Sequence, residues 1–125
     1  MKKRKSIIIA DADSYLSGIY ARRFEMARFE VRVAEDQQQV IKLVAEKRPD
    51  VLLIDSQSIE QANNLIRQFR SNPKTATVTV VVLTELGHSQ AVTEAIQAGA
   101  DSYILKGHFV PVEVIAKVER LVAGS

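Results

Sequence analysis

Cysteine is absent from this chain of 125 residues, so the chain forms neither disulfide bonds nor metal sites with thiolate ligands. Long hydrophobic runs are missing as well, and none approaches the roughly 20 apolar residues that a membrane-spanning helix needs. The start of the chain is basic and lacks the long apolar segment of a signal peptide. These absences predict a soluble, unexported protein of the cytoplasm that makes no contact with a membrane.

The sequence also lacks a strong excess of charge of either sign, with 17 basic residues, 15 acidic residues and a formal net charge of +2. Residues 2–5 carry the positive excess, because the remainder has a net charge of about −2 without them. A body without a basic excess is not typical of a protein that binds nucleic acid. We therefore expect no direct binding to nucleic acid, and we interpret residues 1–5 as a solvated basic leader and residues 123–125 as a tail.

The apolar pattern predicts one domain built from five strand–helix units. Residues 51–54 and 78–83 are apolar on both faces, which is typical of parallel strands covered by helices on both sides. A length of 125 residues suits a single core. The expected fold is therefore α/β, a doubly wound five-stranded parallel sheet with five helices. Its strands are expected to end near five positions: Ala10, Ala34, Ile54, Leu83 and Leu105.

Local signals predict several boundaries within this pattern. Asp36 is expected to cap the second helix, and Gly99 to end the fourth helix in a left-handed conformation. Pro111 suits the first turn of the last helix. Residues 29–33 alternate between apolar and polar side chains, which indicates a strand near the edge of the sheet.

Polar side chains follow four of the five predicted strands: Asp11 and Asp13, then Asp55, Thr84 and Lys106. Because the carboxyl ends of parallel strands meet at one edge of a sheet, these groups are expected to converge. Two carboxylates about 5 Å apart repel each other by roughly 3 kcal/mol at an effective dielectric constant of about 20, and Mg²⁺ would offset that repulsion. Asp55 is then placed to attack a phosphoryl group. Mg²⁺ and Lys106 would neutralise the oxygens of that phosphoryl group, and the Thr84 hydroxyl would donate a hydrogen bond to it.

Four segments, 7–13, 49–55, 80–84 and 98–106, together resemble the receiver domain of two-component response regulators, which has the CheY-like, flavodoxin-like (βα)5 fold. The resemblance covers nearly the whole chain and implies a single receiver domain over residues 1–125. It implies that Asp55 is the phosphoacceptor, which would make the chain a phosphoprotein. It also implies that Mg²⁺ is the cofactor of this site. It further implies roles for four other residues, namely the switch hydroxyl of Thr84, the phosphate-contacting Lys106, the switch aromatic Tyr103, and Gln57, whose backbone carbonyl binds the metal.

The same resemblance implies a function in phosphorelay signal transduction. A histidine kinase or a phosphotransfer protein would supply the phosphoryl group to Asp55. A downstream protein effector would then bind a face formed by residues 88–98, the fifth strand and residues 111–122. The chain is accordingly not expected to be an enzyme, apart from transfer of the phosphoryl group to and from its own aspartate.

The chain departs from the family pattern at several positions. The family usually has two consecutive acids after the first strand, the second of which binds the metal directly, and here that position is Ala12. A methyl group does not ligate Mg²⁺, so either Asp13 takes its place or Mg²⁺ binds weakly. Asp13 is equally suited to cap the first helix. Ser58-Ile59 replaces the usual Met-Pro, Gly107 replaces a proline, and Glu85 stands where a small residue is common and is expected to restrict access to Asp55.

Two other functions remain open from the sequence. Ala12 favours a degenerate receiver, a protein-interaction module that works without phosphorylation. The triplet Asp11-Ala12-Asp13 also resembles the Asp-x-Asp signature of haloacid dehalogenase-type phosphatases, with Asp11 as nucleophile and Asp13 as general acid. A flavin- or nucleotide-binding protein is disfavoured because no glycine-rich loop follows the first strand. His88 and His108 have no partner ligand at useful spacing and are interpreted as loop residues.

Overall fold

The computed structural model describes residues 4–85, 89–106 and 110–123, and it contains five strands that alternate with five helices. The predicted α/β architecture is therefore confirmed. Each strand ends within one residue of its predicted end. In chain order the elements are β1 (Ser6–Ala10), α1 (Ser14–Met26), β2 (Glu30–Ala34), α2 (Gln37–Glu46), β3 (Val51–Asp55), α3 (Ala62–Ser71), β4 (Thr79–Thr84), α4 (Ser89–Ala98), β5 (Ser102–Leu105) and α5 (Pro111–Ala123).

The five strands form one parallel sheet in the order β2-β1-β3-β4-β5. Strand β2 lies at an edge, as its alternating pattern predicted. The central strands β1 and β3 are buried along their whole length, which agrees with apolar side chains on both of their faces. All five carboxyl ends consequently point to one edge of the sheet, here called the carboxyl edge, and the opposite edge is called the amino edge.

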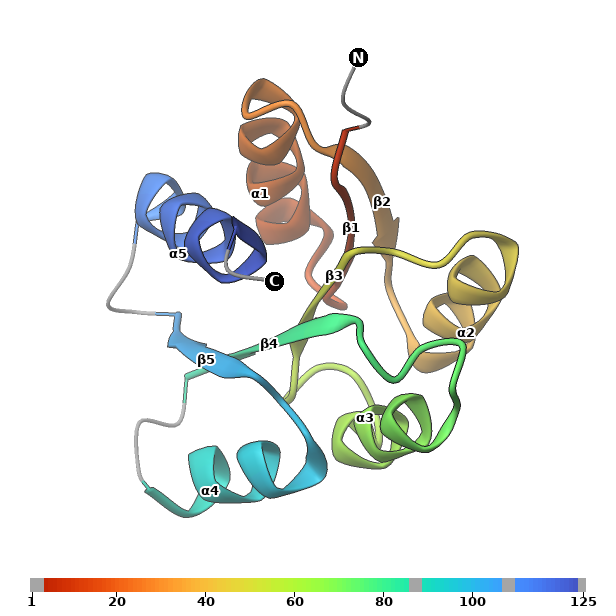
Figure 1. The fold of residues 1–125 in the computed structure, drawn as a ribbon. Helices are drawn as coiled ribbons and strands as arrows, with labels where there is room; N and C mark the ends of the chain where they lie inside the picture. The colour runs from red at the N-terminus through yellow and green to blue at the C-terminus, as the bar shows by residue number, and fades with distance from the viewer. Residues whose placement is uncertain (1–3, 86–88, 107–109, 124–125) are drawn as a thin grey trace.

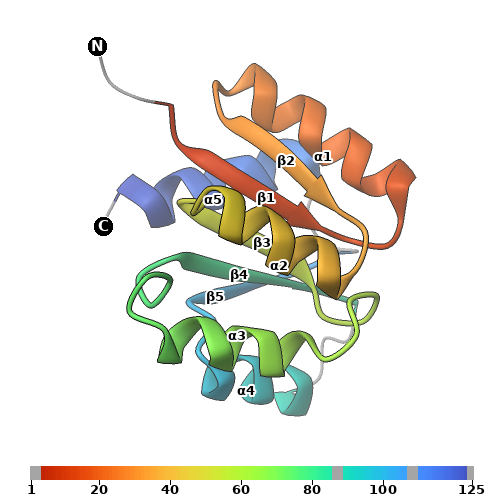
Figure 2. The same cartoon turned by 90° about the vertical axis from the view of Figure 1, so that its right-hand side faces the viewer.

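Helices cover both faces of the sheet, as Figures 1 and 2 show. Helices α1 and α5 pack on one face, where Phe24 and Val118 are buried against Ile9 and Leu53. Helices α2, α3 and α4 cover the other face, where their side chains surround Ile8 and other residues of the alternate strand positions. The two cores follow from the two-residue period of a strand, which sends successive side chains to opposite faces. Among the described residues, no helix has the length and hydropathy that a membrane crossing requires.

The predicted helix boundaries are also confirmed. Asp36 caps α2, because its Oδ1 accepts a hydrogen bond from the Gln39 N–H at 2.8 Å. Helix α4 ends at Ala98, and Gly99 follows with φ +121°. A Cβ added at Gly99 would lie 2.6 Å from Cγ of Arg70, so this position requires glycine for space as well as for conformation.

Candidate functional site at the carboxyl edge

The strand period explains why three charged residues share one corner of the carboxyl edge. Asp55 continues the row of Val51 and Leu53, whose side chains face helices α1 and α5. Asp11 follows the corresponding row of β1, and Lys106 follows Ile104 of β5 in the same way. Each charged side chain is therefore directed to the α1–α5 side of the sheet edge by the strand that precedes it.

Lys106 forms an ion pair with each of the two carboxylates. Its Nζ lies 3.0 Å from Oδ2 of Asp11 and also donates a hydrogen bond to Oδ2 of Asp55. The side chains of Asp11, Asp55 and Lys106 are respectively 0%, 5% and 10% exposed. Loss of the Lys106 ammonium group would leave two buried carboxylates without a counter-ion, which costs much stability.

The surroundings of Lys106 have opposing effects on its pKa. Burial lowers the pKa, but the hydrogen bonds and charges of Asp55 and Asp11 outweigh burial and raise it above its ordinary value. The buried Tyr20 of α1 lies near the same charges; burial raises the pKa of its phenol, while the positive charge of Lys106 opposes that rise. Lys106 is consequently charged at neutral pH.

Asp11 has hydrogen-bond donors on both carboxylate oxygens. Oδ2 accepts from Lys106, and Oδ1 accepts from the Asp13 N–H at 2.9 Å and from the Ser58 hydroxyl at 3.2 Å. The Ser58 oxygen in turn accepts from the Ala12 N–H at 3.0 Å. Sequence reasoning treated Ser58 only as a loop replacement and missed this bridge. The available signal was a hydroxyl in the loop after Asp55, at a position where an apolar methionine is usual.

Asp55 is held by the loop that follows it. Its Oδ1 accepts hydrogen bonds from the Gln57 N–H at 2.8 Å and the Ser58 N–H at 3.3 Å. The side-chain oxygen of Gln57 accepts from the Glu85 N–H at 2.7 Å, which links this loop to the end of β4. Gln57 was predicted to act through its backbone carbonyl, and the contact of its side chain was not anticipated.

The remaining predicted residues lie at different depths. Thr84 is 2% exposed at the end of β4, next to Lys106 along the edge, and its carbonyl accepts from the Lys106 N–H at 2.9 Å. Tyr103 lies on the edge strand β5 and is 37% exposed, with Nζ of Lys117 5.5 Å from its ring centre. The structure therefore brings Asp11, Asp55 and Lys106 into direct contact, places Thr84 beside them and leaves Tyr103 on the surface.

Asp13 and Ala12 determine how well the site suits a metal ion. Asp13 caps α1, because its Oδ1 accepts from the N–H groups of Tyr15 and Leu16 at 3.0 and 3.2 Å. Ala12 brings no oxygen from its side chain, and the described residues contain no cluster of three or more histidine, aspartate or glutamate side chains suited to a metal. Two buried carboxylates fit Mg²⁺, which commonly uses one or two and keeps several waters.

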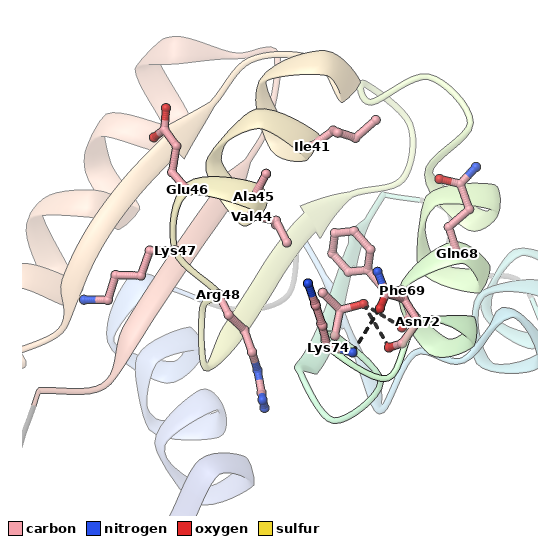
Figure 3. A pocket seen from close by; sticks show the side chains of 11 residues that line it. Ile41, Val44, Ala45, Glu46, Lys47, Arg48, Gln68, Phe69, Asn72 and Lys74 are labelled. Carbon is pink, nitrogen blue, oxygen red and sulfur yellow. Dashed lines mark hydrogen bonds between the residues drawn. The ribbon is translucent and has the colours of Figure 1, made fainter.

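The amino edge of the sheet holds a pocket with different chemistry. A half-open pocket of about 520 Å³ lies between the ends of α2 and α3, and its walls include Val44, Phe69, Arg48 and Lys74 (Figure 3). These residues precede β3 and β4, so the pocket is at the end of the sheet remote from Asp55. Its lining contains no aspartate and a single glutamate, Glu46.

The family model of the response regulator receiver domain matches residues 7–119. The chain belongs to this family. A receiver domain is a module of two-component signalling and in general is not an enzyme, and the match lends nothing to the phosphatase alternative. The predictions for His88, Gly107 and His108 fall outside the described residues, as do residues 1–3 of the predicted leader and residues 124–125 of the predicted tail.

Several proteins similar to this chain are described as transcriptional or DNA-binding regulators. The phosphate regulon transcriptional regulatory protein PhoB of Pseudomonas aeruginosa is 29% identical over 120 residues, which cover 92% of this chain and 50% of PhoB. The DNA-binding response regulator MtrA of Mycolicibacterium paratuberculosis is 30% identical over 115 residues, again 92% of this chain and 50% of the relative. The chain thus spans about half the length of these curated relatives.

Solved structures have the same fold. A Chloroflexus aurantiacus protein assigned as a response regulator superposes with a TM-score of 0.87 at 27% identity, over 97% of this chain and 99% of that protein. The chemotaxis protein CheY4 of Vibrio cholerae also gives a TM-score of 0.87, at 17% identity and over 94% of this chain and 98% of CheY4. The second likeness shows the fold alone.

Proposed function

We propose that Asp55 accepts a phosphoryl group from a histidine kinase or a phosphotransfer protein. An oxygen of the Asp55 carboxylate attacks phosphorus, a new O–P bond forms, and the bond from phosphorus to the donor's imidazole nitrogen breaks. The observation that carries this proposal is the ammonium group of Lys106, which lies against both buried carboxylates. It offsets the negative charge that gathers as the phosphate approaches, and the Thr84 hydroxyl is expected to donate a hydrogen bond to a phosphate oxygen.

Mg²⁺ is part of this proposal, and when bound it would neutralise phosphate oxygens. Asp55, Asp11 and the backbone carbonyl of Gln57 would hold it, with Asp13 available only if it leaves its helix cap. Because Ala12 supplies no carboxylate, we expect weaker binding of Mg²⁺ than a site with a third acid would give.

The output of the proposed receiver is a change on the face formed by α4, β5 and α5. This face carries exposed apolar side chains, among them Ile96, Tyr103 and Val112 at 43%, 37% and 59% exposure. Thr84 would move towards the phosphate and Tyr103 would turn inward, and the affinity of a downstream protein would change. We infer that residues 1–125 act as one receiver domain in the cytoplasm, without direct contact to nucleic acid.

One specific feature favours a second candidate, a receiver that binds its partner without phosphorylation. Every oxygen of Asp11 and Asp55 already accepts a hydrogen bond from within the chain. Ala12 removes a metal ligand from the same place. A site that is satisfied without metal or phosphate has less to gain from either one.

The test is incubation with acetyl phosphate and Mg²⁺, followed by measurement of the intact mass. The wild type is expected to gain one phosphoryl group, and Asp55→Asn none. Asp36→Asn is the matched control, because position 36 lies away from the site and asparagine is still able to cap α2. This variant is expected to react like the wild type. Absence of an adduct on the wild type, with partner binding that survives Asp55→Asn, would favour the second candidate.

A further inference from the structure

We propose that the Ser58 hydroxyl controls the access of Mg²⁺ to Asp11, and that it thereby weakens metal binding beyond the effect of Ala12. This inference rests on the proposed function, because it concerns the regulation of the same site. Its chemistry is a competition for one carboxylate oxygen, Oδ1 of Asp11. A hydroxyl hydrogen of this chain and a metal ion, or a water bound to that ion, compete for that oxygen.

Three hydrogen bonds define the position of Ser58. Its N–H donates to Oδ1 of Asp55 at 3.3 Å, its oxygen accepts from the Ala12 N–H at 3.0 Å, and its hydroxyl donates to Oδ1 of Asp11 at 3.2 Å. The hydroxyl donates to Asp11 because an ionised carboxylate only accepts, while the same hydroxyl oxygen accepts from the Ala12 N–H. One residue therefore connects both acidic loops.

Of the donors to Asp11, the Ser58 hydroxyl is the one that can leave with the least change. The Asp13 N–H belongs to the backbone at the start of α1, where the Asp13 side chain holds the turn. Lys106 is almost buried and is held by two carboxylates. Ser58 has an exposed side chain, and rotation about its single Cα–Cβ bond removes the hydroxyl from Asp11.

The consequence is a defined effect of removing the hydroxyl. In Ser58→Ala, Oδ1 of Asp11 keeps only the Asp13 N–H, and a lone pair becomes available to Mg²⁺ or its bound water. A net contribution of about 0.5 to 1.5 kcal/mol for one hydrogen bond corresponds to roughly twofold to tenfold tighter binding of Mg²⁺. Ser58→Thr keeps a hydroxyl and is expected to bind Mg²⁺ like the wild type.

The experiment is a titration of the ¹⁵N-labelled chain with MgCl2, monitored through the amide signals of Gln57 and Asp13. Ser56→Ala is the matched control, because the Ser56 hydroxyl lies in the same loop but bonds the Leu83 carbonyl instead of an acid. The expected result is a lower Mg²⁺ dissociation constant for Ser58→Ala and wild-type values for Ser58→Thr and Ser56→Ala. Thermal melts of the metal-free proteins check that each variant is folded.

An unchanged or higher dissociation constant in folded Ser58→Ala overturns the inference, as does a failure of both wild type and Ser58→Ala to bind Mg²⁺. The same samples are treated with acetyl phosphate so that the two proposals fail separately. An adduct on Asp55 with unchanged Mg²⁺ binding overturns only the role of Ser58. Tighter Mg²⁺ binding without an adduct supports the competition at Asp11 and overturns phosphorylation of Asp55.

Discussion

The two edges of the sheet differ in how deeply their charged side chains are buried. At the carboxyl edge, Lys106 and its two aspartates are nearly buried and bonded to one another. At the amino edge, the ion pair of Lys47 with Glu30 has side chains that are 55% and 48% exposed, beside a pocket of about 520 Å³. This pocket and the buried charges of Asp11, Asp55 and Lys106 are thus at opposite edges. This difference teaches that the two edges are distinguished by how deeply their charged side chains are buried.

Removing one cation from each edge tests most strongly whether the burial of charge separates the two edges. Lys106→Met leaves two buried carboxylates without their counter-ion, and we expect a loss of about 3 kcal/mol or more in the free energy of unfolding at neutral pH. Lys47→Met removes one partner of an exposed pair, and we expect little change. Urea denaturation measures both. Equal losses in the two variants would show that burial does not separate the edges.

Adding a carboxylate at the carboxyl edge should have the next largest effect. In the absence of metal, Ala12→Asp places a third acid beside Asp11 and is expected to lower the free energy of unfolding by about 1 to 3 kcal/mol. Mg²⁺ should reverse this loss and bind at least tenfold more tightly than to the wild type. Thermal melts with and without MgCl2 measure both effects, and Ala12→Asn is the uncharged control. A gain in Mg²⁺ affinity that is equal in Ala12→Asn would contradict the account.

Alkaline pH should weaken the carboxyl edge in a predictable direction. The folded-state pKa of Lys106 and of Tyr20 is raised above the ordinary value. Each group therefore contributes stability below its unfolded-state pKa, about 10, and this contribution is lost as pH rises through the folded-state value. The free energy of unfolding should fall above about pH 10, and Tyr20→Phe should make the fall shallower. A stability that rises from pH 9 to pH 11 would contradict this sign.

The smallest effect is expected at the amino edge. Lys74→Ala changes the wall of the pocket in Figure 3, at the edge of the sheet opposite to Asp11 and Asp55. We therefore expect wild-type rates of Asp55 modification by acetyl phosphate. Time courses of intact mass compare the two proteins. A marked loss of rate in folded Lys74→Ala would mean that the two edges are coupled, and the comparison would need revision.

The fold was largely predictable from the sequence because its signals are local. The apolar run before Asp11 and the two-sided run before Asp55 define β1 and β3, and Asp36 defines the start of α2 by its own hydrogen bond. The contact of Asp11 with Lys106 joins residues 95 positions apart, yet it was predictable because parallel strands end at the same edge.

The parts of the site that were not predicted depend on loop conformation. The periodic pattern of apolar residues does not indicate that the Ser58 hydroxyl reaches Asp11 or that the Gln57 side chain reaches the Glu85 N–H. Gln61 is a further example, since it adopts a left-handed conformation with φ +55° just before α3 without being glycine. These two contacts and the Gln61 conformation depend on tertiary packing, which local patterns in a single sequence do not indicate.

The central claim is that Asp55 is the phosphoacceptor, and chemical location of the phosphoryl group tests it most directly. The chain is treated with acetyl phosphate and Mg²⁺ and then reduced with borohydride, which converts an aspartyl phosphate to homoserine and releases phosphate. Peptide mass spectrometry then identifies the changed residue. The account predicts homoserine at position 55 and unchanged Asp11 and Asp13. Homoserine at position 11, or at no position, would contradict it.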